Sequence, residues 1–330
     1  MVITEALFEE RIQHLVKLEK KWVIGLSGGA DSLCLILLAN VLAKAHGIEL
    51  FACIVDHKLR IESSDEILPI LDLLGKAGIR HKVFTWHHDD DIGGSIERKA
   101  RDARYGFLYG FCEEVGAGVL VTAHHAMDQW ETFFMRLSHG SSLRGLSCIK
   151  PVSRCGNVLL VRPLLDFTPS DIRETLADRF GIWTYVNDPS NSDPRFERVR
   201  WRNAHQQLAK NHGLDIMNVN KTITRLQNAN DCLDKMANNA TQEIFDGTYI
   251  KMSMFSELHI ELRMRVLHTV LNAVSARGPH IISYDLLHRV SHDICAPGFV
   301  ATNLSGVVMR KDRTKNVRCS QEERGLSRDS

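Results

Sequence analysis

The chain has 330 residues, of which 44% are hydrophobic and 25% charged, a composition that supports a packed core and suggests two domains. Its 41 basic and 40 acidic residues give a formal net charge of +1. This excludes a global basic field, so any contact with nucleic acid must come from local basic patches.

The eight cysteines include no Cys-x-x-Cys pair, which favours a reducing compartment over a disulfide framework. The first 22 residues carry early acidic side chains, and the richest apolar run, 33–45, is too short to span a bilayer, so we predict a cytoplasmic protein without membrane contact.

Short apolar segments alternate with helical patterns over the first half of the chain. We expect strands at Trp22–Leu26, Glu49–Val55, Lys82–Trp86, Val119–Thr122 and Val158–Val161. We expect helices at 6–16, Asp31–Ala45, Asp65–Lys76, Ser95–Val115, Ala126–Leu137 and Ser170–Phe180. This alternation predicts an α/β fold with a doubly wound, mostly parallel sheet. In such sheets ligands bind beyond the carboxyl ends of the strands.

The alternation breaks at Asp188–Pro194, a segment rich in turn formers. A basic helix follows, and further helices are expected at about Val219–Glu243, Glu257–Val274 and Ser283–Val290. We therefore predict a catalytic domain at 1–214, a linking helix with a smaller, mainly helical accessory domain at 215–320, and a polar tail at 321–330.

A glycine-containing motif joins the first predicted strand to the next helix. It reads Ser27-Gly28-Gly29-Ala30-Asp31-Ser32. The glycines permit a tight turn with inward-facing N–H groups, and the helix N-terminus that follows is a ready anion site. No Gly-Lys-Ser/Thr follows, so this is not a Walker A motif. The six residues match the PP-loop pattern; the alternative is an ordinary capped turn.

Two further strand ends carry polar groups. His124 and His125 follow the fourth strand, and Asp128 and Glu131 share one face of the helix that begins there. Such carboxylates suit Mg²⁺ or an amine, although solvated acids at a helix start are an alternative. Asp56 and His57 end the second strand, where they could meet a ribose or base, or form a charged turn.

Arginines recur at three places. Arg98, Arg101 and Arg104 lie at helical spacing, which suits phosphate binding or a solvated basic face. The arginines after the Asp188 turn alternate with aromatic residues, a pattern that RNA contact requires but that a charged helix also shows; these are Arg195, Arg198, Arg200 and Arg202. Arg310 and Arg313 belong to a third basic cluster, which is an RNA footprint or a solvated hairpin.

Together these segments resemble the tRNA(Ile)-lysidine synthetase family of the PP-loop class. The resemblance rests on the runs 27–32, 55–63, 100–105, 122–125, 128–132, 162–164 and 188–191. It implies that ATP, with Mg²⁺, adenylates the carbon 2 oxygen of the wobble cytidine in a tRNA(Ile) with a CAU anticodon. The ε-amine of free L-lysine then displaces AMP to give lysidine.

The resemblance also implies residue roles. Residues 27–32 hold ATP, with Asp31 near Mg²⁺ and with Asp56, His57, His124 and His125 beside the nucleotide. Asp128 and Glu131 bind the lysine amine or the metal, and Arg104 stabilises developing phosphate charge. Arg198 and Arg202 reach the active site or the anticodon loop, and Arg195, Arg200, Arg310 and Arg313 contact RNA. A homodimer is a possible assembly.

Three alternative functions require features that differ from these. A PP-loop tRNA thiolase needs cysteine pairs or a cysteine near the nucleotide, for which Cys53 and Cys148 are the loose candidates. A non-catalytic nucleotide- or RNA-binding module would need neither Asp128 nor Glu131. A glutamine-dependent amide ligase would need an amidotransferase domain, for which the remaining length leaves no room.

Overall fold

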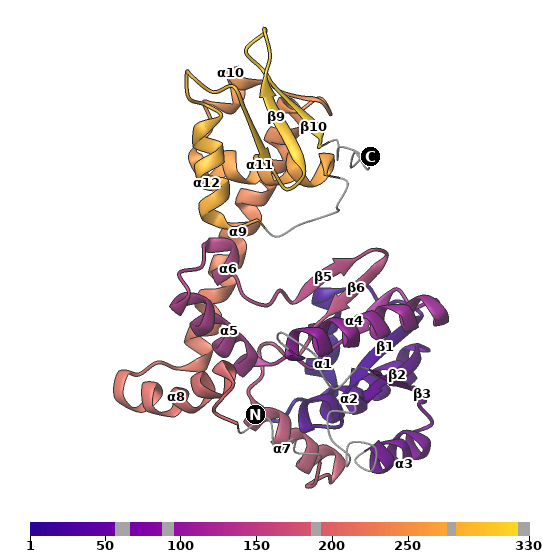
Figure 1. The fold of residues 1–330 in the computed structure, drawn as a ribbon. Coiled ribbons are helices and arrows are strands. Elements are labelled where there is room, and N and C mark those ends of the chain that lie inside the picture. Colours follow the sequence, from indigo (N-terminus) through magenta and orange to yellow (C-terminus); the bar gives the residue numbers. More distant parts are fainter. Residues whose placement is uncertain (57–66, 88–95, 186–192, 276–281, 323–330) are drawn as a thin grey trace. The chain divides into compact units, whose positions relative to one another are not determined.

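The computed structural model describes residues 1–56, 67–87, 96–185, 193–275 and 282–322. The chain forms two compact units (Figure 1). The first contains Met1–Ser141 and Gly145–Thr224, and the second contains Ser142–Arg144 and the chain from Arg225 onward. The predicted contacts of His57 and of the Asp188–Asn191 run lie outside the described residues.

A six-stranded sheet forms the centre of the first unit, with the strand order β3-β2-β1-β4-β6-β5. Its strands are β1 Lys21–Leu26, β2 Glu49–Asp56, β3 Arg80–Thr85, β4 Val119–Val121, β5 Val152–Cys155 and β6 Val158–Val161. All neighbouring pairs are parallel except β5 and β6. The predicted doubly wound, mostly parallel sheet is therefore confirmed.

Helices cover both faces of this sheet (Figure 1). On one face lie α1 Glu5–Leu15, α2 Ala30–His46, α3 Leu68–Ala77 and α7 Pro169–Phe180, and on the other lies α4 Ile96–Val115. The helices α5 Ala126–Ser138, α6 Leu143–Leu146 and α8 Glu197–His212 do not belong to these two cores, and α5 contributes to a separate one. Because side chains alternate across a strand, Trp22 and Ile24 of β1 join the core that contains α2, whereas Val23 joins the core that contains Leu108 and Phe111 of α4.

The strand order reverses between β1 and β4. β2 and β3 lie on one side of β1, and β4 and β6 lie on the other. At such a switch point the loops that follow the two central strands diverge and leave a crevice for a ligand. The loop at Ser27–Gly29 and the loop at Thr122–His125 are those loops, so the topology places two of the predicted motifs side by side.

The second unit combines helices with a small antiparallel sheet. Helix α9, Ile216–Ile244, starts in the first unit and runs into the second, which also contains α10 Met252–Phe255, α11 Ile260–Val274 and α12 Tyr284–Asp293. The sheet has the order β7-β10-β9-β8, with β7 Tyr249–Ile250, β8 Ala301–Leu304, β9 Val307–Lys311 and β10 Val317–Gln321. The predicted helices are confirmed, but this sheet was not predicted, because strands of two to five residues give little periodic signal.

Candidate active site

The loop after β1 is fixed by the hydroxyl of Ser32. This buried oxygen accepts hydrogen bonds from the N–H groups of Ser27 (3.2 Å) and Gly28 (3.1 Å), and it donates to the carbonyl of Gly29 (3.0 Å). Gly28 has φ +83°, in the left-handed region that glycine adopts without a steric penalty. Ser32 therefore shapes the loop from inside, and the motif needs glycine at position 28.

Helix α2 begins directly after this loop and presents an open N-terminus. No side chain caps α2 at Gly29. By contrast, the N-termini of α5 and α7 are each covered by a carboxylate, since Asp128 and Asp171 accept from the backbone N–H of His125 and Thr168. The free N–H groups and positive dipole end of α2 are thus available to an anion.

A cavity of about 750 Å³ opens at these loops, within the volume range of small-molecule sites. Its described lining includes most of the predicted site: Ser27, Gly29, Ala30, Asp31, Ser32, Arg104, His124, His125, Asp128, Arg198 and Arg202. Gly28, Asp56 and Glu131 do not line it; Asp56 is buried at the end of β2, where its carbonyl accepts from the N–H of Trp86.

The two histidines of the site differ in charge: His124 is neutral and His125 is positively charged. Burial lowers the pKa of His124 to about 3, so its ring is neutral, and its Nδ1 lies 3.0 Å from the hydroxyl of Thr122. Burial also opposes charge on His125, but Asp128 and then Asp31 raise its pKa to about 9. The charged His125 ring lies between these carboxylates, with Nε2 3.5 Å from Asp31 Oδ2 and Nδ1 3.4 Å from Asp128 Oδ2.

Two arginines of α8 hold the acids of α5. Arg198 donates to Asp128 Oδ1 (2.8 Å) and to Glu131 Oε2 (2.9 Å), and Arg202 donates to Glu131 Oε1 (2.7 Å). Glu131 is 0% exposed and lies behind the cavity wall, whereas Asp128 reaches the cavity. Burial would raise the pKa of Asp128, but the positive charge of His125 and that of Arg198 keep it well below its usual range. Asp128 therefore stays ionised.

The cavity is strongly cationic. Its described lining contains five arginines and the charged His125 but only two carboxylates, Asp31 and Asp128. Burial lowers the pKa of Arg104, but a guanidinium remains charged in proteins. Within the described chain no carboxylate lies at ion-pair distance from Arg104, so its charge is available to a ligand. An anion with several negative charges fits this site best.

The cavity also includes residues for which we had predicted no role. Thr168, Pro169, Ser170 and Arg173 at the start of α7 line it, and so does Tyr185. A helix start is visible in the sequence of α7, but nothing local indicates that it faces the α2 loop. That arrangement follows from the packing of α7 on α2, in which Ile172 and Leu176 share a core with the apolar face of α2.

The remaining predicted RNA contacts lie away from the cavity lining. Arg195 is paired with Asp193, and Arg200 donates to the carbonyls of Pro194 and Arg195. In the second unit, Arg310 on β9 and Arg313 in the turn after it are exposed. Arg310 lies directly opposite Arg318 of β10. Such a like-charge pair is unfavourable by itself.

The sheet topology, the uncapped α2 loop and the cationic crevice define an ATP-binding protein of the PP-loop class. A PP-loop domain family matches residues 4–208. The U34-tRNA thiolase NcsA from Methanococcus maripaludis, solved with its [4Fe-4S] cluster, shares the fold, with a TM-score of 0.56 and 21% identity over 68% of this chain and 80% of that one.

Curated relatives narrow the class further. A tRNA(Ile)-lysidine synthase from Bradyrhizobium sp. is 35% identical over 271 residues, which is 78% of this chain and 75% of the relative. One from Orientia tsutsugamushi is 29% identical over 88% of this chain and 68% of its own length. The chain belongs to the tRNA(Ile)-lysidine synthase family.

Along the described residues, no helix combines the length and apolar character that a membrane crossing requires.

Proposed function

We propose that the enzyme ligates L-lysine to carbon 2 of the wobble cytidine in a tRNA(Ile) with a CAU anticodon. ATP first adenylates the carbon 2 oxygen and releases pyrophosphate, and the lysine ε-amine then attacks carbon 2 and releases AMP. The observation that carries this proposal is the cavity at the switch point, where the open α2 loop adjoins the ionised Asp128 and the free cation of Arg104. The α2 loop suits a phosphate, Asp128 suits an ammonium group, and Arg104 suits the negative charge that develops on a phosphate.

The α2 loop is the best candidate for the phosphates of ATP. Ser27, Gly29 and Ala30 of this loop line the same cavity as Arg104, and the uncapped N-terminus of α2 follows them. Reactions at phosphorus depend mainly on position and on neutralisation of charge. On this proposal Arg104 stabilises the charge that develops at the α-phosphate, and the rigid Ser32-centred loop fixes the reacting geometry.

The residues of the cavity also fit Mg²⁺. Among the described residues no cluster of three metal-ligating side chains exists, but Mg²⁺ beside a nucleotide usually takes one or two carboxylates together with phosphate oxygens and water. Asp31, at the first turn of α2, is partly exposed in the cavity and supplies such a carboxylate. The ion would neutralise charge on the phosphates.

Asp128 is the proposed contact for the amine of lysine. An acid that remains ionised is a poor proton acceptor but a good partner for an ammonium group. The neutral His124, with a pKa of about 3, is a poor base as well. We therefore assign Asp128 to holding and orienting the amine by charge. Glu131, which the cavity does not reach, would act through Arg198 and Arg202.

Arg198, Arg202 and the exposed arginines of β9 and its turn are the proposed RNA contacts. Arg198 and Arg202 line the cavity, where a flipped base and its phosphate would enter. Arg310 and Arg313 would meet the RNA backbone through phosphate contacts, which contribute affinity without reading sequence. The proposed homodimer would enlarge this surface.

Thiolation of a tRNA nucleotide is a less well-supported function for this chain. No cysteine belongs to the described lining of the cavity. Cys53 is buried in β2, and burial raises the pKa of its thiol to about 12, which leaves little reactive thiolate. Cys148 has its pKa raised to about 12 for the same reason.

The test is AMP release from ATP with lysine and tRNA supplied separately and together. We expect AMP only when both L-lysine and a tRNA(Ile) transcript with a CAU anticodon are present. A transcript with a UAU anticodon is the matched control. AMP release that requires tRNA but does not depend on lysine would support adenylation and contradict the amine transfer. No AMP release in any mixture would favour a binding module.

A further inference from the structure

Arg162, the residue that follows β6 in the first unit, is a buried cation without a carboxylate partner. It is 8% exposed, and its Nη1 donates to the carbonyl of Lys150 (2.7 Å) and to the hydroxyl of Ser153 (3.1 Å). Its buried Nε has no hydrogen-bond partner among the described residues, and none of their carboxylates lies close enough to Arg162 for an ion pair. A buried charge that is not paired destabilises a fold, so stability does not account for this arginine.

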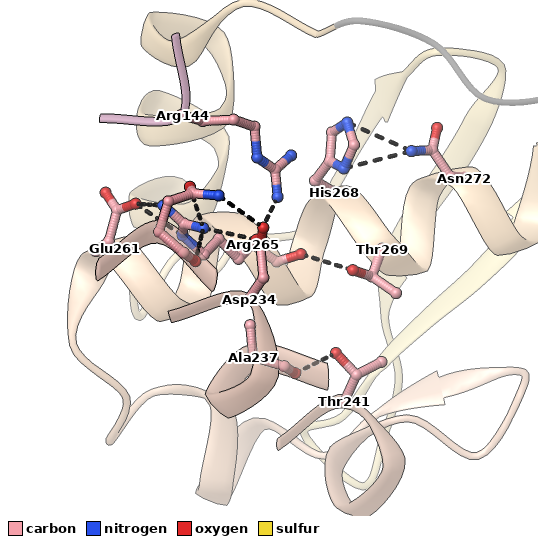
Figure 2. Close-up of polar contacts among 10 residues, drawn as sticks. Arg144, Asp234, Ala237, Thr241, Glu261, Arg265, His268, Thr269 and Asn272 are labelled. Atoms are coloured by element: carbon pink, nitrogen blue, oxygen red, sulfur yellow. Dashed lines mark hydrogen bonds and ion pairs between the residues drawn. The ribbon is translucent and has the colours of Figure 1, made fainter. Parts of the chain in front are cut away.

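A buried arginine of the second unit shows the usual arrangement (Figure 2). Arg265 of α11 is 5% exposed, and its guanidinium donates to the side chains of Glu261 (2.8 Å) and Asp234 (2.6 Å). The two carboxylates neutralise its charge, and the side chain of Asn230 accepts a further hydrogen bond at 2.9 Å. Arg162 has only neutral acceptors by comparison.

Arg162 holds Tyr105 of α4. The phenol of Tyr105 is a further hydrogen-bonding partner of its guanidinium. On the same ring, the guanidinium carbon of Arg101 lies 5.0 Å from the ring centre, at cation–π distance. Arg101 and Arg104 both line the cavity, and Arg104 directly precedes Tyr105. Tyr105 therefore connects Arg162 to two arginines of the site.

Arg162 also holds the segment 145–150, which is bound to α5. Its bond to the Lys150 carbonyl fixes the end of this segment to β6. One residue earlier, the buried amide of Gln129 donates to the carbonyl of Ile149 (2.8 Å) and accepts from its N–H (2.9 Å). Gln129 directly follows Asp128, so this segment joins the sheet to the part of α5 that carries the site.

The backbone of the same segment is strained. Cys148 has φ +52°, in the left-handed region that is unfavourable for a residue with a side chain. Arg136 of α5 donates to the carbonyl of Gly145 at 2.6 Å and to that of Cys148 at 3.4 Å. A strained conformation persists only where the surrounding bonds determine it, so the segment is a firm connection between the sheet and α5.

We propose that Arg162 is a positioning residue for the site. Through Tyr105 it orients the arginines of α4, and through the segment 145–150 it sets the place where α5 begins. The inference rests on the proposed function, in which Arg104 and Asp128 contact the substrates. The charge of Arg162 also reaches the site, since it adds to burial in lowering the pKa of His124.

The test compares Arg162→Met with Arg162→Lys and with the control Arg154→Met. Arg154 is an exposed arginine on β5, in the same hairpin. Hydrogen–deuterium exchange of residues 101–109 and 126–138 in the free protein reports on α4 and α5. Steady-state kinetics report kcat and the KM for ATP, and thermal unfolding reports stability, with Arg265→Met as the stability comparison.

For Arg162→Met we expect exchange in both helices to rise roughly two- to fivefold and kcat to fall roughly 10- to 30-fold, the effect of about two lost hydrogen bonds. The KM for ATP should stay within twofold, because Ser32 fixes the α2 loop independently. The unfolding temperature should not fall, because an unpaired buried charge has been removed. In contrast, Arg265→Met should unfold at a lower temperature, since it leaves two carboxylates without their cation.

Two milder variants keep the test decisive if Arg162→Met does not fold. Arg162→Lys retains the charge and a donor, so it should recover part of kcat. Tyr105→Phe removes only the phenol oxygen, and it should lower kcat roughly threefold and raise exchange in 101–109. Arg154→Met should match the wild type in every measurement.

A wild-type kcat in Arg162→Met, whatever its unfolding temperature, would overturn the proposal. A lower unfolding temperature with unchanged exchange in 101–109 and 126–138 would also overturn it and leave Arg162 a local stabilising role. The exchange measurement needs no substrate. If both helices respond as expected but the wild-type enzyme forms no AMP, the proposed function fails while the positioning role stands.

Discussion

Replacement of Glu131 by glutamine tests whether this buried acid acts on the substrate or on the arginines. Glu131 accepts from Arg198 at 2.9 Å and from Arg202 at 2.7 Å. Glutamine retains one acceptor oxygen, but its amide would point N–H groups at the other guanidinium. One charge-assisted hydrogen bond is lost and the second is weakened, which costs about 2–3 kcal/mol. Since 1.36 kcal/mol is a factor of ten, we expect kcat to fall roughly 30- to 150-fold.

The assay is steady-state AMP formation with each substrate varied in turn, alongside thermal unfolding to confirm that the variant is folded. Because Glu131 is placed behind the cavity, the loss should appear in kcat and in the KM for tRNA, while the KM for lysine stays nearly constant. A rise confined to the KM for lysine would refute this reasoning and make Glu131 a direct ligand of the amine. Glu113→Gln, at an exposed position of α4, is the control and should match the wild type.

Three further predictions concern the nucleotide site. Gly28→Ala places a side chain on a residue with φ +83°, which costs about 1–2 kcal/mol of backbone strain, so calorimetry should show ATP binding weakened about tenfold. Its control is Gly47→Ala, at φ +65° with open space around it, which should lower the unfolding temperature without changing ATP binding. Arg104→Ala should lower kcat roughly 10²- to 10³-fold with little change in the KM for ATP, as for the loss of one preorganised charge donor, whereas Arg195→Ala should leave kcat within twofold of wild type. The pKa of His125, raised to about 9, predicts that its charge and stabilising contribution are complete below its ordinary value near 6.5 and are lost as the pH rises through about 9; ATP affinity should fall over that interval, and a pH-independent affinity up to 10 would contradict the assignment.

The sheet and the nucleotide loop were predictable from sequence because both depend on local patterns. Apolar runs such as Trp22–Leu26 mark buried strands, and a Gly-Gly pair before a helix allows the positive φ that a tight turn requires. His124, His125 and Asp128 could be placed at the same edge, because the carboxyl ends of parallel strands meet there.

The partners of the acids could not be predicted in the same way. Nothing near Glu131 in the sequence indicates that Arg198 and Arg202 bury it, since those residues lie about 70 positions away. Arg173 was missed because its place at the cavity depends on the packing of α7 against α2. The four strands of the second unit are too short for a periodic signal, and their pairing depends on contacts between distant segments.

The most direct test of the account is the identity of the modified nucleoside. A tRNA(Ile) transcript with a CAU anticodon, incubated with the enzyme, ATP, Mg²⁺ and isotopically labelled L-lysine, is digested to nucleosides and analysed by mass spectrometry. The account predicts that the cytidine at the wobble position gains one labelled lysine less one water, in an amount equal to the AMP released. Unmodified cytidine after AMP release, or a modification that carries no label, would contradict it.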